Sequence, residues 1–448
     1  MNEQNTTKNI KTPRYAAVLS LNSSFKSGKF VNLELDSTIK KYGFTDKDKS
    51  FYTRLLYGTV ERKLTLDYII SLLSDVKEDK IEPLVKCILE TGLYQIFYMD
   101  RVPDSAACNE ATNLVKTLCP KSYAGYVNAV MRNAVRRKSE LVEKVMTLTG
   151  TKGISVRHSV PEWICELWQK DYGEAEKIAH GFEIIPPHIT LRVNTLKITA
   201  KELFDNMPEG YGARLIGNDL VTLSKSVPVA EIYGYEEGLF FVQDESSASA
   251  ASLISRESVK AENPVIIDTC ACPGGKTFAM AIALENKGTV YSFDLHQNRL
   301  TLIEKGTNRL GITSVKTKAN DARFPMEELF GKADAVLCDV PCSGLGIIAK
   351  KPDIRYKNKE EIERLPEIQK EILMQSAKYV KDGGILVYST CTLRKAENED
   401  NINYFLERNP NFELADDVYD GCGMKTFFPH KDGTDGFFAA KLIKKNME

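Results

Sequence analysis

The spacing of apolar residues divides the chain into a helical first part and a mixed remainder. Between residue 12 and about residue 140, apolar side chains recur every three or four residues, which is the period of a helix with one buried face. Five stretches show this pattern: RYAAVLSLNSSF, VNLELDSTIKKY, DKSFYTRLLYGTVERKLTLDYIISLL, IEPLVKCILETGLYQIFYM and SAACNEATNLVKTL. Thr45, with two aspartates in the next three residues, suits a helix N-cap, and Pro83 suits a first helical turn. We therefore predict an all-α domain over residues 1–145.

Strand patterns enter after residue 150. SVPEWICELWQKDYGEAEKIAHGFEI is still helical in pattern, but ITLRVNT and DLVTLSK are typical of short strands, with the helical ITAKELFDNM between them. This mixture predicts a small α+β module at residues 150–235. GLFFVQDESSASAASLI then has the pattern of a strand that leads into a helix.

From residue 264 onward, apolar strands alternate with helices. The strand patterns are PVIID, GTVYSFD, SVKTKAN, ADAVLCD and GGILVYST. Strands separated by helices are typical of βαβ units, so we predict a mostly parallel sheet covered by helices on both faces. This α/β domain is expected over residues 236–448.

Length and composition agree with several soluble domains. A chain of 448 residues is too long for one compact core, so two or three domains are expected. The first residues, MNEQNTTKNIK, lack the apolar run of a signal peptide, and no window reaches the ~18 consecutive apolar residues of a membrane span. We expect a cytoplasmic protein without a membrane segment, in which the ten cysteines are free thiols.

The near-neutral charge hides an asymmetry. Residues 1–140 hold 22 Lys and Arg against 16 Asp and Glu, whereas the remainder holds 38 against 45. A basic first part favours a face that binds a polyanion, although a solvated helical surface rich in lysine is an equally good interpretation. The strongest local basic feature is the group Arg132, Arg136, Arg137 and Lys138.

A glycine-rich turn follows the first strand of the α/β domain. VIID runs into TCACPGGKT and then into an apolar helix, so the backbone at Gly274 and Gly275 can approach a ligand closely. The pattern is neither G-x-x-x-x-G-K-[ST] nor G-x-G-x-x-G, which argues against nucleoside triphosphate and nicotinamide ligands. The loop therefore indicates a cofactor of another kind.

Three aspartates stand at the ends of successive strands. Asp268 ends the first strand, Asp294 ends the second, and Asp321 follows the third. An acidic group at the second strand end suits ribose hydroxyls, while a crevice of carboxylates repels phosphates and suits a nucleoside with a positive centre, such as S-adenosylmethionine. Alternatively, each aspartate is a helix cap or a turn residue.

Two cysteines and another aspartate follow the fourth and fifth strands. Asp339 ends the fourth strand, Cys342 lies three residues later, and Cys391 lies just past the fifth strand. Because neighbouring parallel strands end at one edge, these residues should converge beside the cofactor site. A thiolate that adds to carbon 6 of a pyrimidine makes carbon 5 nucleophilic towards a methyl donor. A carboxyl group on the Watson–Crick edge of the base would stabilise that adduct. Packing of a lone thiol at a strand end is the competing interpretation.

A metal site is not expected. Cys270 and Cys272 form a C-x-C pair, but no second pair lies at the spacing of a zinc site, and the five histidines are scattered. The remaining cysteines are interpreted as core or incidental positions: Cys87, Cys108, Cys119, Cys165, Cys338 and Cys422.

The ordered motifs resemble those of RNA cytosine-5 methyltransferases, the RsmB/Sun, Nop2 and NSUN proteins. The resemblance rests on DTCACPGGKT, SFDLHQNRL, NDAR, DVPCSGLGIIAKKPDIRY, STCTLRKAENEDN and DGFFAAKLIK, which together cover about 237–445. RHSVPEWICELW, ITLRVNT and GLFFVQDESS upstream also resemble this family. The helical first part is similar to the NusB-type RNA-binding domain of the RsmB/Sun branch, which methylates bacterial small-subunit ribosomal RNA.

The resemblance implies roles for individual residues in a Rossmann-like methyltransferase domain. Cys391 would be the nucleophile, Cys342 would aid product release, and Asp339 would lie nearest the target base. Asp294 would hold the ribose and Asp321 the adenine of S-adenosylmethionine. The rest of the implied cofactor pocket is Cys270, Ala271, Cys272, Pro273, Gly274, Gly275 and Lys276.

The implied reaction is methylation of carbon 5 of a cytosine in 16S ribosomal RNA, with naked or early-assembly RNA as the partner. A monomer is expected, because nothing in the sequence marks an interface. Two residues depart from the family pattern, since Cys272 and Val340 stand where alanine is usual, and little loss of activity is expected from either. The alternatives are a transfer-RNA methyltransferase, which the NusB-like part disfavours, and a non-catalytic assembly factor, which the intact Cys391 disfavours. A DNA methyltransferase would take its nucleophile from the proline–cysteine motif at Cys342.

Overall fold

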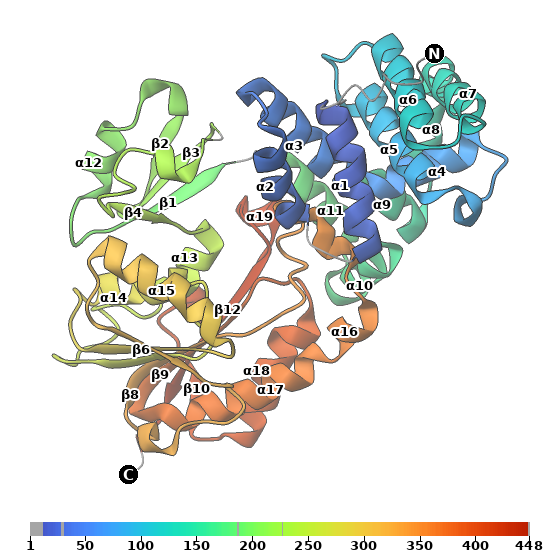
Figure 1. Ribbon diagram of the computed structural model, residues 1–448. Helices are drawn as coiled ribbons and strands as arrows, with labels where there is room; N and C mark the ends of the chain where they lie inside the picture. The colour runs from blue at the N-terminus through green and yellow to red at the C-terminus, as the bar shows by residue number, and fades with distance from the viewer. Residues whose placement is uncertain (1–11, 28–30, 186–187, 226, 447–448) are drawn as a thin grey trace. The chain divides into compact units, whose positions relative to one another are not determined.

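The computed structural model describes residues 12–27, 31–185, 188–225 and 227–446. The chain forms two compact units. The first runs to Ala179 and includes the later segment Ala349–Tyr356, and the second runs from His180 to Ile348 and from Lys357 onward. Figure 1 shows both units and labels most of their helices and strands.

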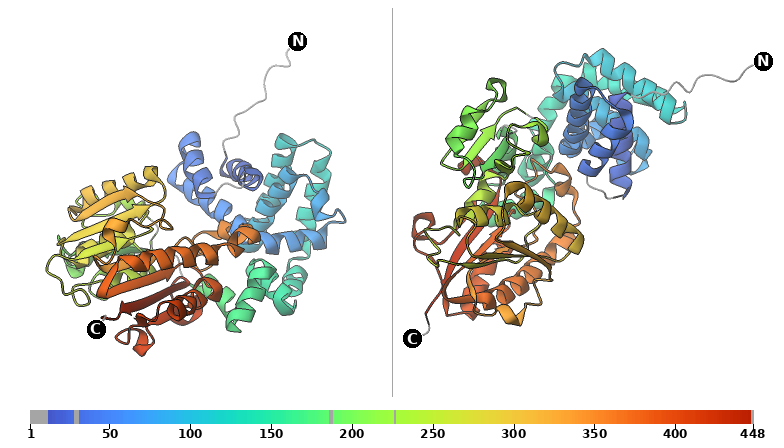
Figure 2. Two further views of the ribbon diagram at one scale, coloured as in Figure 1. Left: turned by 90° about the horizontal axis from the view of Figure 1, so that it is seen from below. Right: turned by 60° about the vertical axis from the view of Figure 1, so that its left-hand side comes forward.

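The first unit is helical, as predicted for the first part of the chain. Its helices are α1 (Pro13–Ser27), α2 (Val31–Tyr42), α3 (Asp46–Glu61), α4 (Lys63–Leu73), α5 (Pro83–Tyr98), α6 (Asp104–Leu118), α7 (Tyr123–Arg136), α8 (Lys138–Met146), α9 (Gly150–His158) and α10 (Glu162–Tyr172). Helix α11 (Ala175–Ile184) crosses into the second unit. Figure 2 shows these helices, coloured blue to teal, from two further directions.

Local signals in the sequence explain several helix ends. The Thr45 hydroxyl accepts a hydrogen bond from the Asp48 amide and caps α3, and Pro83 occupies the first turn of α5. The stretch DKSFYTRLLYGTVERKLTLDYIISLL, which has helical spacing throughout, is divided at Arg62, which ends α3 and precedes α4. Helix α5 is buried along most of its length, so its apolar residues form the centre of this unit's core.

The segment Ala349–Tyr356 packs against helix ends of the first unit. The Arg355 guanidinium donates to the backbone carbonyls of Glu61 (2.8 Å) and Ser159 (3.0 Å), and the Tyr356 hydroxyl donates to the carbonyl of Val60 (2.9 Å). Carbonyls at helix C-termini lack partners within the helix, so these donors satisfy them.

The second unit begins with a small antiparallel sheet, which has the order β2-β3-β1-β4. The strands are β1 (Ile189–Val193), β2 (Ala213–Ile216), β3 (Leu220–Leu223) and β4 (Phe240–Val242), and helix α12 (Ala200–Asp205) follows β1. Strand β2 was not predicted, because its residues ARLI show no marked alternation of apolar and polar side chains. In the structure these residues are partly or fully exposed. This four-stranded module confirms the predicted α+β character of the region.

The four-stranded module is bonded to helix α15 (Gln297–Leu310), which packs on the larger sheet described below. The Asn194 side chain donates to the Leu310 carbonyl (2.8 Å), and Lys197 Nζ donates to the Arg309 carbonyl (3.2 Å). Arg309 in turn donates to the Tyr235 carbonyl (2.6 Å) and stacks over the Tyr235 ring. These contacts bring a positive charge to the C-terminal end of α15, where it is favourable, and hold the module in place.

The larger sheet has eight strands: β5 (Val265–Asp268), β6 (Thr289–Asp294), β7 (Val315–Ala319), β8 (Ala333–Asp339), β9 (Val380–Thr390), β10 (Phe412–Leu414), β11 (Met424–Phe427) and β12 (Phe437–Lys444). Its order is β10-β12-β9-β8-β5-β6-β7, with β11 paired to β12. Strands β5 to β9 are parallel, which confirms the predicted α/β sheet, whereas β10, β11 and β12 pair in antiparallel fashion.

Helices cover both faces of the larger sheet (Figure 1). Helices α13 (Glu245–Ser252), α14 (Gly275–Ala283) and α15 pack on one face with Ile266 and Leu337, and α17 (Leu365–Ser376) and α18 (Glu399–Arg408) pack on the other with Ile267 and Cys338. Successive strand residues therefore point to opposite, fully buried faces. In the part of the chain that the structure describes, no helix is both long and apolar enough to span a lipid bilayer.

Candidate active site

The strand order places a crevice between β5 and β8. The chain runs outward from β5 through β6 to β7, then returns to β8 on the opposite side of β5 and continues to β9. The loops after β5 and β8 therefore diverge, and ligands of open α/β sheets bind at such a point. Asp268 ends β5 and Asp339 ends β8, so both carboxylates lie at this edge.

The loop between β5 and α14 is shaped by its glycines. Gly274 has φ +113, and a Cβ there would lie 2.5 Å from the Phe278 ring, so only glycine fits this position without a shift. Thr277, in the first turn of α14, donates to the Asp268 carboxylate at 2.7 Å. Burial raises the pKa of Asp268 to about 7. The loop thus passes over a carboxyl group that can carry a proton near neutral pH.

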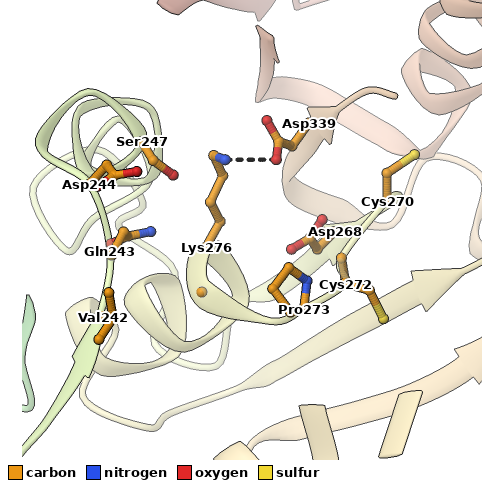
Figure 3. Close-up of a pocket in the computed structure, with 12 residues that line it drawn as sticks. Val242, Gln243, Asp244, Ser247, Asp268, Cys270, Cys272, Pro273, Lys276 and Asp339 are labelled. Carbon is orange, nitrogen blue, oxygen red and sulfur yellow. Dashed lines mark hydrogen bonds and ion pairs between the residues drawn. The ribbon is translucent and has the colours of Figure 1, made fainter. Parts of the chain in front are cut away.

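A cavity of about 190 Å³ lies beside this loop (Figure 3). Seven of the residues expected at the site line it: Cys270, Ala271, Cys272, Pro273, Gly275, Lys276 and Asp339. Asp268 lines it too, together with four residues to which the sequence had assigned no role, Val242, Gln243, Asp244 and Ser247. Those four lie in the GLFFVQDESS stretch, so the resemblance of that stretch was the only signal that pointed to them.

Gly274, Asp294 and Asp321 are not among the lining residues of the cavity. Asp294 accepts hydrogen bonds from the backbone amides of Cys272 (3.3 Å) and His296 (3.0 Å), so it ties the glycine loop to the end of β6. Asp321 is held by Arg323, whose Nη2 lies 2.6 Å from a carboxylate oxygen and which lowers the pKa of Asp321. These contacts hold the two carboxylates in the turns after β6 and β7.

Lys276, Asp339 and Ser389 form a hydrogen-bonded chain at the mouth of the crevice. Lys276 Nζ lies 2.7 Å from Asp339 Oδ2, and the Ser389 hydroxyl donates to Asp339 Oδ1, also at 2.7 Å. Asp339 and Ser389 are register partners on β8 and β9, so the sheet itself sets this contact. Burial favours a lower pKa for Lys276, but the Asp339 carboxylate outweighs it and raises the pKa above its usual value. A charged ammonium therefore stands at the ends of β8 and β9.

The structure brings the two strand-end thiols into contact. Cys342 Sγ and Cys391 Sγ are 3.2 Å apart, and both side chains are partly exposed. The hydrogen bond with Cys391, followed by burial, raises the pKa of Cys342 well above its usual value. Cys342 therefore keeps its proton at neutral pH and can donate it to the sulfur of Cys391. By contrast, burial raises the pKa of Cys272 in the glycine loop to about 12, which makes it a poor nucleophile.

A buried polar cluster ties the two cysteine loops together. Glu397, which is fully buried, accepts from the backbone amide of Ser343 and from Gln369 Nε2, each at 2.9 Å. The Ser343 hydroxyl contacts the Thr392 hydroxyl at 2.6 Å, and the Gly346 amide donates to the Cys391 carbonyl at 3.0 Å. Ser343 and Thr392 each follow a thiol, so this cluster fixes the separation of the two sulfurs.

The fold and the families that match it define a methyltransferase. The family described as 16S rRNA methyltransferase RsmB/F matches residues 258–443, the NusB family matches residues 11–136, and a ferredoxin-like domain of RsmF/B-like methyltransferases matches residues 160–230. These matches confirm the predicted order of a NusB-like helical part, a small α+β module and a methyltransferase domain.

Similar proteins place the chain in one family. The probable ribosomal RNA small subunit methyltransferase B of Bacillus subtilis (strain 168) is 36% identical over 93% of this chain and 95% of its own length. Ribosomal RNA small subunit methyltransferase B of Proteus mirabilis (strain HI4320) is 31% identical over 92% and 95%. The chain belongs to the RsmB/F methyltransferase family, as the resemblance of its motifs implied.

Solved structures share the fold. The crystal structure of PH0851 is 24% identical, covers 96% of this chain and 99% of its own, and has a TM-score of 0.77. NSun6 from Pyrococcus horikoshii, solved with SFG, is 25% identical over 64% of this chain and 99% of its own, with a TM-score of 0.55. The shared architecture extends to both units of this chain in the first case.

Proposed function

We propose that this protein transfers a methyl group from S-adenosylmethionine to carbon 5 of a cytosine in small-subunit ribosomal RNA. The observation that carries the proposal is the contact of two thiols, Cys342 and Cys391, beside the Lys276–Asp339 pair. The names of the relatives, ribosomal RNA small subunit methyltransferase B, support the substrate. A single packed thiol would need neither a partner sulfur nor an ion pair at the neighbouring strand ends.

The cavity suits S-adenosylmethionine in its chemistry. Its charged side chains, the Asp244 and Asp339 carboxylates and the Lys276 ammonium, favour a ligand that carries both a positive and a negative group. The amide nitrogen of Gln243 is buried and has no hydrogen-bond partner among the described residues, so a polar ligand is needed to satisfy it. The residues proposed to hold the cofactor are Cys270, Ala271, Cys272, Pro273, Gly274, Gly275, Lys276, Asp294, Asp321 and Asp339. When bound, the cofactor supplies an electrophilic methyl group.

Cys391 is the proposed nucleophile. The thiol loses its proton to water, the sulfur forms a bond to carbon 6 of the cytosine, and the electron pair of the carbon 5–carbon 6 double bond moves to carbon 5, which can then accept a methyl group. Asp339 accepts a hydrogen bond from the amino group on the Watson–Crick edge of the base and so orients the ring. Ser389 and Lys276 hold the two oxygens of Asp339, which keeps this acceptor in one orientation.

Cys342 is the proposed release group. After methylation, the proton of carbon 5 passes to a water molecule, the electrons of that bond restore the carbon 5–carbon 6 double bond, and the carbon 6–sulfur bond breaks. The electron pair of the broken bond returns to the sulfur of Cys391. A proton donated by Cys342 makes that sulfur a better leaving group, and the raised pKa of Cys342 keeps the proton available.

The parts of the chain before the methyltransferase domain are proposed to bind RNA, with the limits 1–145, 150–235 and 236–448 as the working division. Arg132 and Arg136 on α7 donate to Asn128 and Asn133 of the same helix, whereas Arg137 pairs with Glu140. The positive charge of the first two arginines is thus the better candidate for phosphate contact. The target cytosine must leave its stack to reach the thiols. The proposal describes a monomeric cytoplasmic enzyme that needs no metal ion.

Covalent trapping tests the roles of the two thiols. Cys342→Ala protein is incubated with S-adenosylmethionine and unmethylated small-subunit ribosomal RNA and run on a denaturing gel. We expect a slowly migrating protein–RNA adduct, because release is blocked, and we expect it to vanish when Cys391→Ala is added. Cys422→Ala, a change at an exposed thiol away from the cavity lining, is the matched control and should give no adduct. An adduct from Cys391→Ala but not from Cys342→Ala would reverse the two roles.

A further inference from the structure

Gln243 links the four-stranded module to the cofactor cavity. It directly follows β4, its side chain is 5% exposed, and it lines the cavity. Arg192 of β1 donates through Nη1 to Gln243 Oε1 at 3.0 Å. Because a guanidinium can only donate, the atom facing Arg192 must be the oxygen of the amide, and the NH₂ group must point the other way.

The NH₂ group of Gln243 points over the start of helix α14. A Cβ placed on Gly275, the first residue of α14, would lie 3.7 Å from Gln243 Nε2 and near nothing else within 4 Å. Figure 3 shows the amide nitrogen turned toward the helix that carries Lys276. No hydrogen-bond acceptor reaches this nitrogen from any residue that the structure describes. A buried donor in this state calls for an acceptor from a ligand.

The surroundings of Gln243 Nε2 indicate what the ligand presents. The first amides of a helix have no acceptor within the helix, and the helix dipole favours a negative group at its N-terminus. Gly275, without a side chain, leaves room for that group directly above the first turn of α14. The Gln243 Nε2 donor thus lies beside the first residue of α14, and an anionic group with two acceptor oxygens suits this place better than a hydroxyl or an aromatic ring.

We propose that Gln243 binds the carboxylate of the amino-acid end of S-adenosylmethionine, and that Arg192 is the positioning residue that aims it. This inference rests on the proposed use of that cofactor. Asp294 and Asp321, the residues expected at the ribose and adenine, do not line the cavity, which leaves the cavity to the amino-acid end. Asp268 and Asp339 line it as well and can accept from the ammonium group of the same ligand.

Arg192 depends on the four-stranded module for its own placement. It is 6% exposed, its Nη2 lies 3.0 Å from Asp219 Oδ2, and its Nη1 also donates to the Ala248 carbonyl at 3.3 Å. Arg192 lies on β1 and Asp219 directly precedes β3, so both belong to the module that precedes the catalytic sheet. The module therefore acts on cofactor affinity through one side-chain hydrogen bond.

Two ligands that differ only at the amino-acid end test this inference. Isothermal titration calorimetry of the full chain would measure the Kd of S-adenosylhomocysteine and of 5′-methylthioadenosine, which lacks the amino-acid group. We expect Gln243→Ala to raise the Kd of S-adenosylhomocysteine by about ten- to a hundredfold and to change the Kd of 5′-methylthioadenosine by less than about twofold. Arg192→Met should show the same selective loss to a smaller extent. Gln169→Ala, at an exposed glutamine of α10, is the matched control and should change neither Kd.

If Gln243→Ala raises the Kd of both ligands equally, Gln243 has a structural role only and the inference is overturned. It is also overturned if neither Kd changes. Gly275→Ala gives a second measure that leaves the Gln243 side chain intact, because its new Cβ lies 3.7 Å from Gln243 Nε2, an ordinary contact distance, and takes up space beside that nitrogen. The Gly275→Ala protein should keep its fold, measured by circular dichroism, and should still bind S-adenosylhomocysteine more weakly while its Kd for 5′-methylthioadenosine is unchanged. Wild-type protein that binds neither ligand would overturn the proposed function, and this inference with it.

Discussion

The substitution Glu397→Gln probes how the two thiols are held. The fully buried Glu397 carboxylate receives hydrogen bonds from the Ser343 amide and Gln369 Nε2, and its other oxygen lies 3.5 Å from Arg394. A hydrogen bond to a charged acceptor is worth about 1.5–3 kcal/mol and one to a neutral acceptor about 0.5–1.5 kcal/mol. Weakening two such bonds and removing the partner of Arg394 should lower the free energy of unfolding by about 2–4 kcal/mol.

The same substitution should slow catalysis, because Ser343 follows Cys342 directly and its release lets the two sulfurs move apart. A misplacement of this kind costs about ten- to a hundredfold in rate. Amide hydrogen exchange of β9 is the suitable stability assay, since both tryptophans, Trp163 and Trp168, lie in the first unit and do not report on the sheet. Glu407→Gln, at an exposed position of α18, is the matched control. Unchanged protection of β9 together with an unchanged rate of methyl transfer would refute this reasoning.

Three further predictions follow from individual side chains. The pKa of Asp268 is about 7 in the folded protein and 3.8 in its usual, unfolded state, so between these pH values the folded protein binds more protons than the unfolded chain. The free energy of unfolding should therefore fall by up to about 4 kcal/mol as the pH rises from 4 to 7. Asp268→Asn should flatten that slope in urea unfolding, and an equal slope in both proteins would contradict it. At pH 8, iodoacetamide should alkylate Cys342 more slowly than the exposed Cys422. In the Cys391→Ala variant, which lacks the main cause of the raised pKa of Cys342, alkylation of Cys342 should be faster than in the wild type. Peptide mass spectrometry measures these rates. Gly274→Ala should lower the melting temperature, in line with a loss of about 1–3 kcal/mol from strained backbone and a ring clash, and a wild-type melting curve would contradict this.

Much of the architecture was predictable because its elements carry strong local patterns. The parallel strands β5, β6, β8 and β9 are short apolar runs between helices, and the order of the motifs places their ends at one edge. Strand β12 is different: FFAAKLIK is buried on both faces but contains Lys441, which is 3% exposed and bonds to Asp417. A buried lysine interrupts the apolar run, so only its pairing with β9 identifies the strand.

The candidate site was predictable where strand ends define it and hidden where another module completes it. Asp339, Cys342 and Cys391 follow from the ends of β8 and β9. The role of Gln243 depends on Arg192, about fifty residues earlier and on a different sheet, so no local pattern reveals it. Glu397 lies in a stretch of polar residues that would be expected on the surface, and only its tertiary contacts bury it.

The most direct test of the central claim is the chemical identity of the methylated nucleoside. Unmethylated small-subunit ribosomal RNA would be incubated with the protein and S-adenosylmethionine that carries a deuterated methyl group, then digested to nucleosides and analysed by mass spectrometry. We expect labelled 5-methylcytidine from the wild-type protein and none from Cys391→Ala. Label on the exocyclic nitrogen of cytidine, on a ribose hydroxyl or on another base would contradict it, as would 5-methylcytidine formed at the wild-type rate without Cys391.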